Sequence, residues 1–69
     1  MELKNIQERL REAIKLSGIP QKDLATAVGV SSQTISKYMR RNIFPALDTF
    51  AKLCKALDAD PAYILGLSN

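Results

Sequence analysis

Apolar residues recur at every third or fourth position through most of the chain, which is the spacing of one face of an α-helix. Near the start, the apolar positions are Ile6, Leu10 and Ile14, with charged residues between them. This pattern predicts a helix over about residues 2–16. Gly18 follows that helix, and a glycine there suits the left-handed conformation that closes many helices.

Two shorter helices are predicted next, separated by a glycine. Pro20 fits the start of a helix over residues 21–28, because its fixed φ is helical and the first turn does not need its missing N–H. Gly29 ends that helix, and its tolerance of positive φ suits a tight turn. Ser31 then predicts the N-cap of a helix over about residues 32–40.

The rest of the chain predicts two further helices. A loop up to Pro45 precedes a helix over about residues 46–57, whose apolar positions again follow helical spacing. Asp60 before Pro61 is a strong start signal, because the carboxylate accepts first-turn N–H groups and proline fits the first helical position. The last helix, over residues 61–65, is short and apolar. Since no segment alternates like a β-strand, the sequence predicts an all-α fold of five helices around one core.

Composition limits how this fold is held together. A chain of 69 residues has room for one core, so we expect a single domain over residues 1–69. The only cysteine, Cys54, excludes an intramolecular disulfide, and the lack of histidine leaves no plausible zinc site. Packing must therefore stabilise the fold without a cofactor or metal. Cys54 and Tyr38 both fall on apolar helix faces, where we expect them to be core residues.

The same composition narrows the class of protein. With no histidine, no paired carboxylates in a plausible cleft and no glycine-rich phosphate loop, no residue can be given a catalytic role, so an enzyme is not expected. The single cysteine and the absence of a secretory leader indicate the reducing cytoplasm. No apolar run approaches the length that spans a membrane, and no small-molecule ligand is evident.

Charge is unevenly distributed along the chain. The net charge of +3 is weak support for a polyanionic partner, since many small proteins are equally basic. However, no acidic residue lies between Asp23 and Asp48, and that stretch contains Lys37, Arg40 and Arg41. A basic face of this kind is typical of nucleic-acid-binding proteins, although a solvated surface would have the same charge.

The helices over residues 21–28 and 32–40, with the glycine turn between them, follow the helix-turn-helix plan. Ala25 is small where the two helices would cross, while Val30 and Ile35 would anchor the second one to the core. The outer face of the 32–40 helix then carries polar and cationic side chains three or four positions apart. These residues are Ser32, Gln33, Ser36, Lys37 and Arg40.

These side chains have the chemistry that DNA contacts require. Glutamine can pair with adenine, lysine can donate to guanine, and serine can serve either base. Arginines such as Arg40 and Arg41 suit phosphates, which position a protein without reading sequence. The segment 21–40 therefore predicts binding of double-stranded DNA with the 32–40 helix in the major groove.

The chain resembles the lambda-repressor-like, Cro/repressor-type helix-turn-helix domains. The resemblance runs without gaps from Ile6 to Leu65. Its matching residues are Gln21-Lys22-Asp23-Leu24-Ala25, Val28-Gly29-Val30-Ser31, Thr34-Ile35-Ser36, Pro45, and Leu57 with Tyr63-Ile64-Leu65. It implies a compact five-helix DNA-binding domain of a transcriptional regulator. The implied protein is a phage or bacterial repressor in the bacterial cytoplasm or nucleoid.

The resemblance and the surface chemistry together assign roles to individual residues. Ser32, Gln33 and Lys37 are expected to read bases. The residues expected to hold the DNA backbone are Gln21, Ser31, Ser36, Arg40, Arg41 and Asn42. The implied partner is an inverted-repeat operator bound by a homodimer. Pro61 and Tyr63 are expected at the dimer interface, with Ile64 directed into the core.

Several residues depart from the family pattern. Pro20 stands where many relatives have serine or threonine, so the 21–28 helix should lack a side-chain cap. Arg41 and Asp58 replace common glycines, and after Arg41 the left-handed turn is expected one residue later. Ile14 and Met39 replace an arginine and a glutamate, so an apolar contact is expected where relatives have an ion pair.

Two alternatives to a repressor stay open at this point. The antitoxin of a toxin–antitoxin pair would use the same fold, bind DNA and add a protein partner. A protein-interaction module would keep the fold without binding DNA, and an acidic or apolar outer face on the 32–40 helix would favour it. The face in this chain is polar and basic, which favours the transcriptional regulator.

Overall fold

The computed structural model describes residues 3–40 and 43–67. Within these ranges the regular structure is entirely α-helical, which confirms the predicted fold class. The five helices are α1 (Leu3–Ser17), α2 (Gln21–Val28), α3 (Ser32–Arg40), α4 (Leu47–Leu57) and α5 (Pro61–Leu65). Each helix begins and ends within one residue of its predicted boundary.

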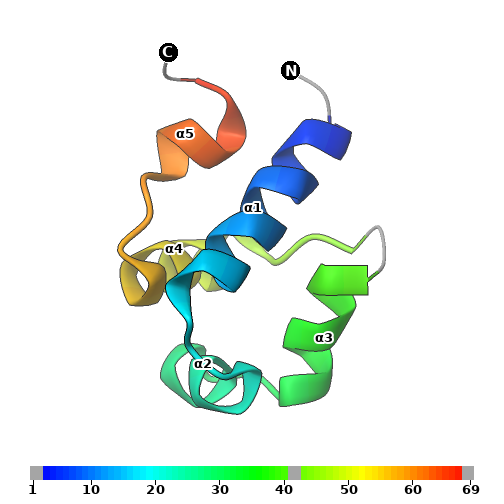
Figure 1. Cartoon of the computed structure of the whole chain (residues 1–69), viewed down its shortest axis with the longest axis vertical. Helices are drawn as coiled ribbons and strands as arrows, with labels where there is room; N and C mark the ends of the chain where they lie inside the picture. The colour runs from blue at the N-terminus through cyan, green and yellow to red at the C-terminus, as the bar shows by residue number, and fades with distance from the viewer. Residues whose placement is uncertain (1–2, 41–42, 68–69) are drawn as a thin grey trace.

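The helices form a compact bundle in which α2 and α3 occupy one end (Figure 1). Helix α2 packs against both α3 and α4, and α1 crosses over α3, α4 and α5. The start of α1 and the end of α5 lie together at the other end of the molecule (Figure 1). The helix-turn-helix is therefore supported from one side by the rest of the fold, and its other side is free.

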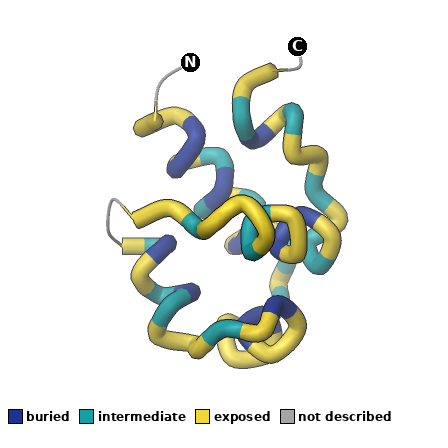
Figure 2. The backbone as a smooth tube through the Cα atoms, turned by 180° about the vertical axis from the view of Figure 1, so that it is seen from behind, coloured by how far each residue is buried: buried dark blue, intermediate teal, exposed yellow. Residues whose placement is uncertain are grey.

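Every helix contributes one fully buried large side chain to the core. These residues are Leu10, Leu24, Ile35, Leu53 and Ile64. Figure 2 shows the buried positions on the inner sides of the helices and the exposed ones on their outer sides. Full burial of such a side chain stabilises a fold by about 1.5–3 kcal/mol, so each helix is held by its own contact with the common core.

The ends of α2 and α4 show how the sequence sets helix length. After α2, the N–H of Val30 donates to the carbonyl of Ala25 at 3.0 Å, and Gly29 has a φ of +76°. This closing pattern needs a left-handed residue, as predicted for Gly29. Asp58 takes the same conformation after α4, with a φ of 53°, and is the only non-glycine residue with positive φ in the described ranges.

The starts of the helices are capped in two different ways. Ser31 accepts a hydrogen bond from the N–H of Thr34 through its Oγ at 3.1 Å, and Asp60 accepts one from Ala62 through Oδ1 at 3.0 Å. Both predicted caps are therefore confirmed. Helix α2 follows Pro20 and has no side-chain cap, as expected, and α4 also begins without one.

The apolar replacement at residues 14 and 39 fits the core. Ile14 is buried, and Met39 packs against the same cluster of buried side chains, so neither lies in solvent. Tyr38 and Cys54 are buried as predicted. No helix of the described residues is long and apolar enough to cross a membrane.

Candidate nucleic-acid interface

The inner side of α3 fixes the direction in which the helix presents its outer side. Ile35 and Tyr38 are 0% and 5% exposed, so both are anchored in the core. At the start of α3, the hydroxyl groups of Ser31 and Thr34 lie 2.9 Å apart within hydrogen-bonding distance. With one side held by burial and the first turn held by a cap, the opposite side of the helix has a defined orientation.

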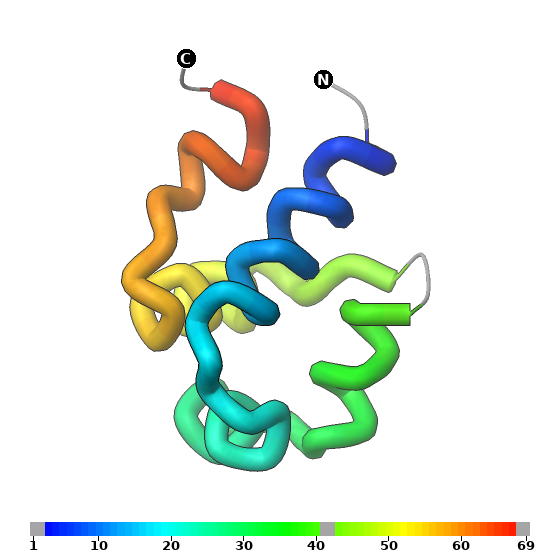
Figure 3. The backbone as a smooth tube through the Cα atoms, viewed as in Figure 1, coloured from blue at the N-terminus to red at the C-terminus, as the bar shows by residue number. Residues whose placement is uncertain are grey.

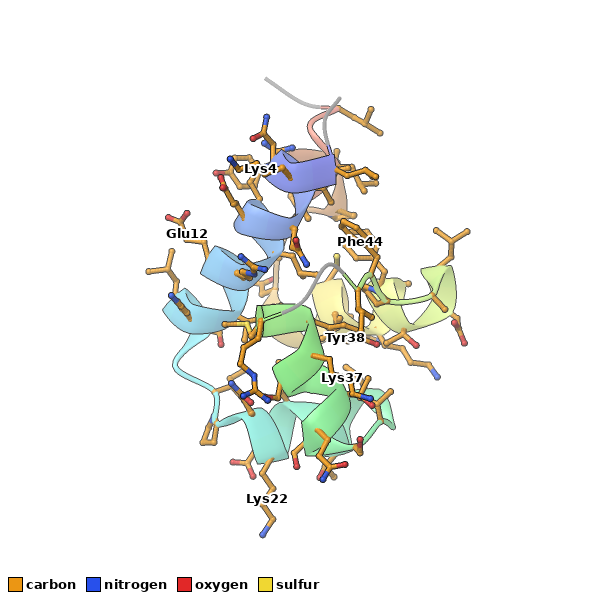
Figure 4. The ribbon with its side chains drawn as sticks, turned by 90° about the vertical axis from the view of Figure 1, so that its right-hand side faces the viewer. Lys4, Glu12, Lys22, Lys37, Tyr38 and Phe44 are labelled. Carbon is orange, nitrogen blue, oxygen red and sulfur yellow. The ribbon has the colours of Figure 1, made fainter. Side chains whose placement is uncertain are left out.

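That opposite side carries the predicted contact residues. Ser32, Gln33, Lys37 and Arg40 are exposed, and Ser36 is half-buried. Because residues three and four apart project from the same part of a helix, α3 brings these five side chains onto one surface. Figure 4 shows Lys37 on α3, on the side of the molecule that faces the viewer. We call these five residues the α3 surface.

The remaining predicted backbone contacts lie at helix starts beside α3. Gln21 is exposed and is the first residue of α2. Because α2 has no side-chain cap, the N–H groups of its first turn are available to an outside acceptor, and a helix start favours anions. Ser31 is also exposed, but its hydroxyl already bonds to Thr34. Arg41 and Asn42 lie outside the described residues.

The electrostatics of this end of the molecule favour an anionic partner. Helix α3 carries Lys37 and Arg40 in its last turn, and its sequence contains no acid. The neighbouring α2 carries one acid, Asp23, and one cation, Lys22. Lys22 is exposed and extends from the end of the fold (Figure 4). Lys22 was not among the predicted contact residues, although its place beside Gln21 in the first turn of α2 indicates a cation close to the predicted phosphate contact.

Tyr38 supports the surface from behind. Burial raises the pKa of its hydroxyl, and the nearby carboxylate of Asp48 raises it further. The ring therefore stays neutral at physiological pH and acts as a core anchor for α3. This burial confirms the prediction that Tyr38 belongs to the core.

A second candidate surface lies on α5. Ile64 is 1% exposed, whereas Tyr63 is 58% exposed and Pro61 is also at the surface. The structure therefore places Ile64 in the core and the other two residues outside, as expected. Tyr63 and the exposed Leu16 border an apolar groove of about 230 Å³ between α1 and α5. Figure 3 shows α5 and α3 on opposite sides of the fold.

The described part of the α3 surface has groups suited to binding DNA, and the described residues contain no cluster suited to a metal ion. Among residues 3–40 and 43–67, no group of three or more histidine, cysteine, aspartate or glutamate side chains could hold a metal ion. The α3 surface instead offers hydroxyl, amide and cationic groups. These are donors and acceptors suited to base edges and phosphates.

The chain is similar to a known protein family. A family model described as helix-turn-helix matches residues 10–64, which reach from the middle of α1 to α5. No curated protein and no solved structure matches the chain significantly. The matched range contains the complete α2, the turn and α3.

Proposed function

The chain belongs to the lambda-repressor-like helix-turn-helix family of DNA-binding transcription regulators, and we propose that it is a repressor that binds an inverted-repeat operator as a homodimer. The observation that carries this proposal is the two-sided character of α3. Ile35 and Tyr38 are buried on one side, and the hydrophilic α3 surface is on the other. A helix of this kind can enter a major groove without exposing core residues.

We assign base contacts to three exposed residues of the α3 surface: Ser32, Gln33 and Lys37. Ser32 and Gln33 lie in the first turn of α3, and the N-terminal residues of a recognition helix are those that reach base edges. The side-chain amide of Gln33 can pair with adenine through two hydrogen bonds. Lys37 lies one turn further and can donate to guanine.

We assign backbone contacts to residues around this centre. Gln21 and the uncapped start of α2 offer N–H donors to one phosphate strand. Arg40 ends α3 and, with Arg41, offers cations to the DNA backbone, while Asn42 offers a neutral amide. Ser31 and Ser36 are the remaining residues to which we assign contacts with the DNA backbone. These contacts orient the protein on the duplex and carry little sequence information.

The proposed dimer interface includes Pro61 and Tyr63. Both residues are at the surface of α5, on the side of the fold opposite to α3 (Figure 3). The molecule is 31 Å in its longest dimension. In the proposed dimer, the two α3 helices would lie in successive major grooves, about 34 Å or one turn of DNA apart.

Selection of bound sites from random duplex DNA tests the proposal. We expect enrichment of an inverted repeat whose half-site centres lie about 10 base pairs apart. Enrichment of single half-sites would leave DNA binding intact and overturn the dimer. No enrichment would overturn sequence-specific binding. A promoter carrying the selected site should give less transcript in vitro when the protein is added; an increase would show an activator.

A further inference from the structure

An open groove runs along α1 beside residues 43–46, which precede α4. It is lined by Leu3, Lys4, Gln7, Glu8 and Arg11 of α1 and by Phe44. Its volume is about 500 Å³, which is within the range of pockets that hold small molecules. Figure 4 shows Lys4 and Phe44 on the same side of the molecule. The groove shares no residue with the α3 surface, so the proposed DNA contacts do not account for it.

The walls of the groove combine apolar surface with positive charge. Leu3 is 67% exposed and Phe44 is 38% exposed, so both present apolar surface that a ligand could cover. Lys4 and Arg11 supply two cations from the same helix, and Glu8 supplies one acid. Apolar walls with a few polar groups are typical of small-molecule sites.

Arg11 brings its guanidinium to the wall of the groove. Its Nε atom is shielded from solvent and has no hydrogen-bond partner among the described residues, so a ligand would meet the rest of the side chain. An oxyanion in the groove would accept hydrogen bonds from the part of the guanidinium that lines it, and hydrogen bonds between two charged groups are the stronger kind.

The DNA backbone is a poor occupant for this groove. A nucleic-acid strand carries a negative charge at every nucleotide. If one phosphate were held by Lys4 and Arg11, Glu8 would repel the neighbouring phosphates. The apolar surfaces of Leu3 and Phe44 would also face a polar strand. A ligand with one anionic group on an apolar body avoids both penalties.

We propose that this groove is a binding site for a small organic anion with an apolar body. Arg11 and Lys4 hold the anionic group, and Leu3 and Phe44 cover the apolar part. The site lies outside the α3 surface and does not depend on the proposed operator binding. The groove could not be predicted from the sequence, because Phe44 and Arg11 are far apart along the chain and line one groove only after folding.

Two aromatic probes that differ in charge test the proposal on the full chain. Anilinonaphthalene sulfonate carries one anionic group, and phenylnaphthylamine has the same ring system without charge. We expect the sulfonate to bind saturably and to shift amide NMR signals of α1 and residues 43–46. Arg11→Gln should lower the affinity for the sulfonate about tenfold, which corresponds to the loss of one charged hydrogen bond. The affinity for the uncharged probe should not change. Lys55→Gln removes an exposed cation of α4 and is the matched control.

Three outcomes would overturn the proposal. The first is equal sulfonate affinity in the wild type and Arg11→Gln. The second is a set of NMR shifts confined to the groove between α1 and α5. The third is displacement of the sulfonate by an acidic peptide that binds more tightly, which would assign the groove to a protein partner. If Arg11→Gln does not fold, Lys4→Gln and Phe44→Ala provide the same comparison. Because the titration contains no DNA, its result is independent of operator binding.

Discussion

The side chain of Arg9 ties the first helix to the last. Its Nε donates to the backbone carbonyl of Ile64 at 2.8 Å, across 55 positions of the sequence. Helix α5 has only five residues, and α1 is the helix that it contacts most. The position of α5, and with it the exposed Tyr63, therefore depends on this bond together with the burial of Ile64.

Replacing Arg9 by alanine should destabilise the fold. The carbonyl of Ile64 would lose a charged donor, and such hydrogen bonds contribute about 1.5–3 kcal/mol. Because Arg9 is only half-buried and water partly competes for its guanidinium, we expect a loss below this range, about 1 kcal/mol. Urea denaturation of the variant measures this loss, with a change at the exposed Lys52 of α4, Lys52→Ala, as the control. An unchanged midpoint for Arg9→Ala would show that α5 is held by Ile64 alone.

If α5 carries the dimer interface, the same variant should affect dimers and single half-sites differently. Arg9→Ala should weaken binding to the selected inverted repeat, because the interface is less well ordered. Binding to an isolated half-site should stay close to wild type, because Arg9 bonds to α5 and is not part of the α3 surface. Equal weakening on both duplexes would contradict the proposed role of α5.

Asp58 should be a site where a glycine stabilises the protein. It takes a φ of 53° at the end of α4, and left-handed backbone costs a residue with a side chain roughly 1–2 kcal/mol more than glycine. Part of that gain is lost because glycine makes the unfolded chain more flexible. We therefore expect Asp58→Gly to raise the free energy of unfolding by about 0.5–1 kcal/mol. Gly29→Ala is the reciprocal change at a φ of +76°, and it should lower stability; stabilisation there would refute the argument.

The local parts of this fold were predictable because each depends on residues close in sequence. Gly29 and Ser31 set the turn before α3 through conformation and capping, and Asp60 with Pro61 starts α5 in the same way. The bond between Arg9 and Ile64 was not predictable, since nothing in either neighbourhood indicates a partner 55 positions away. For the same reason, the orientation of the α3 surface followed from the pattern, whereas the groove beside Phe44 did not.

Ile14 and Met39 provide a test of how the core supports α3. Ile14 is 4% exposed, and Met39 packs against the buried cluster. Ile14→Arg should therefore bury an unpaired charge and destabilise the fold by about 3–5 kcal/mol. The double variant Ile14→Arg with Met39→Glu should recover part of this loss by forming an ion pair. Chemical denaturation of the wild type, both single variants and the double variant measures the coupling. Additive losses would show that the two positions do not interact.

Stability should fall at alkaline pH through Tyr38. Burial raises the pKa of its hydroxyl in the folded state above the usual value near 10. The folded protein then holds this proton more tightly than the unfolded chain does. The contribution of the Tyr38 hydroxyl to the free energy of unfolding is complete below the usual pKa. It is lost as the pH rises from there through the pKa of the folded state. Denaturation midpoints between pH 8 and about 11 should fall less in Tyr38→Phe than in the wild type. Parallel curves would exclude Tyr38 as a cause.

The proposed division of the α3 surface into base and backbone contacts predicts two different mutant phenotypes. Gln33→Ala should weaken binding to the selected operator by about 1–3 kcal/mol and relax the preference at about one or two base pairs. The reason is that the amide of Gln33 would discriminate a base edge. Repeating the selection with the variant identifies the position that loses its preference.

Arg40→Ala should instead weaken all duplexes alike, because a phosphate contact is present on every sequence. It should also reduce the slope of log affinity against log salt by about one, since one fewer counterion is released. Both variants are measured on operator and unrelated duplexes at several salt concentrations. Lys52→Ala, which removes an exposed cation of α4, is the control for a lost cation outside the α3 surface. If Gln33→Ala lowered the salt slope, or Arg40→Ala changed base preference, the two residues would have the reverse of their proposed roles.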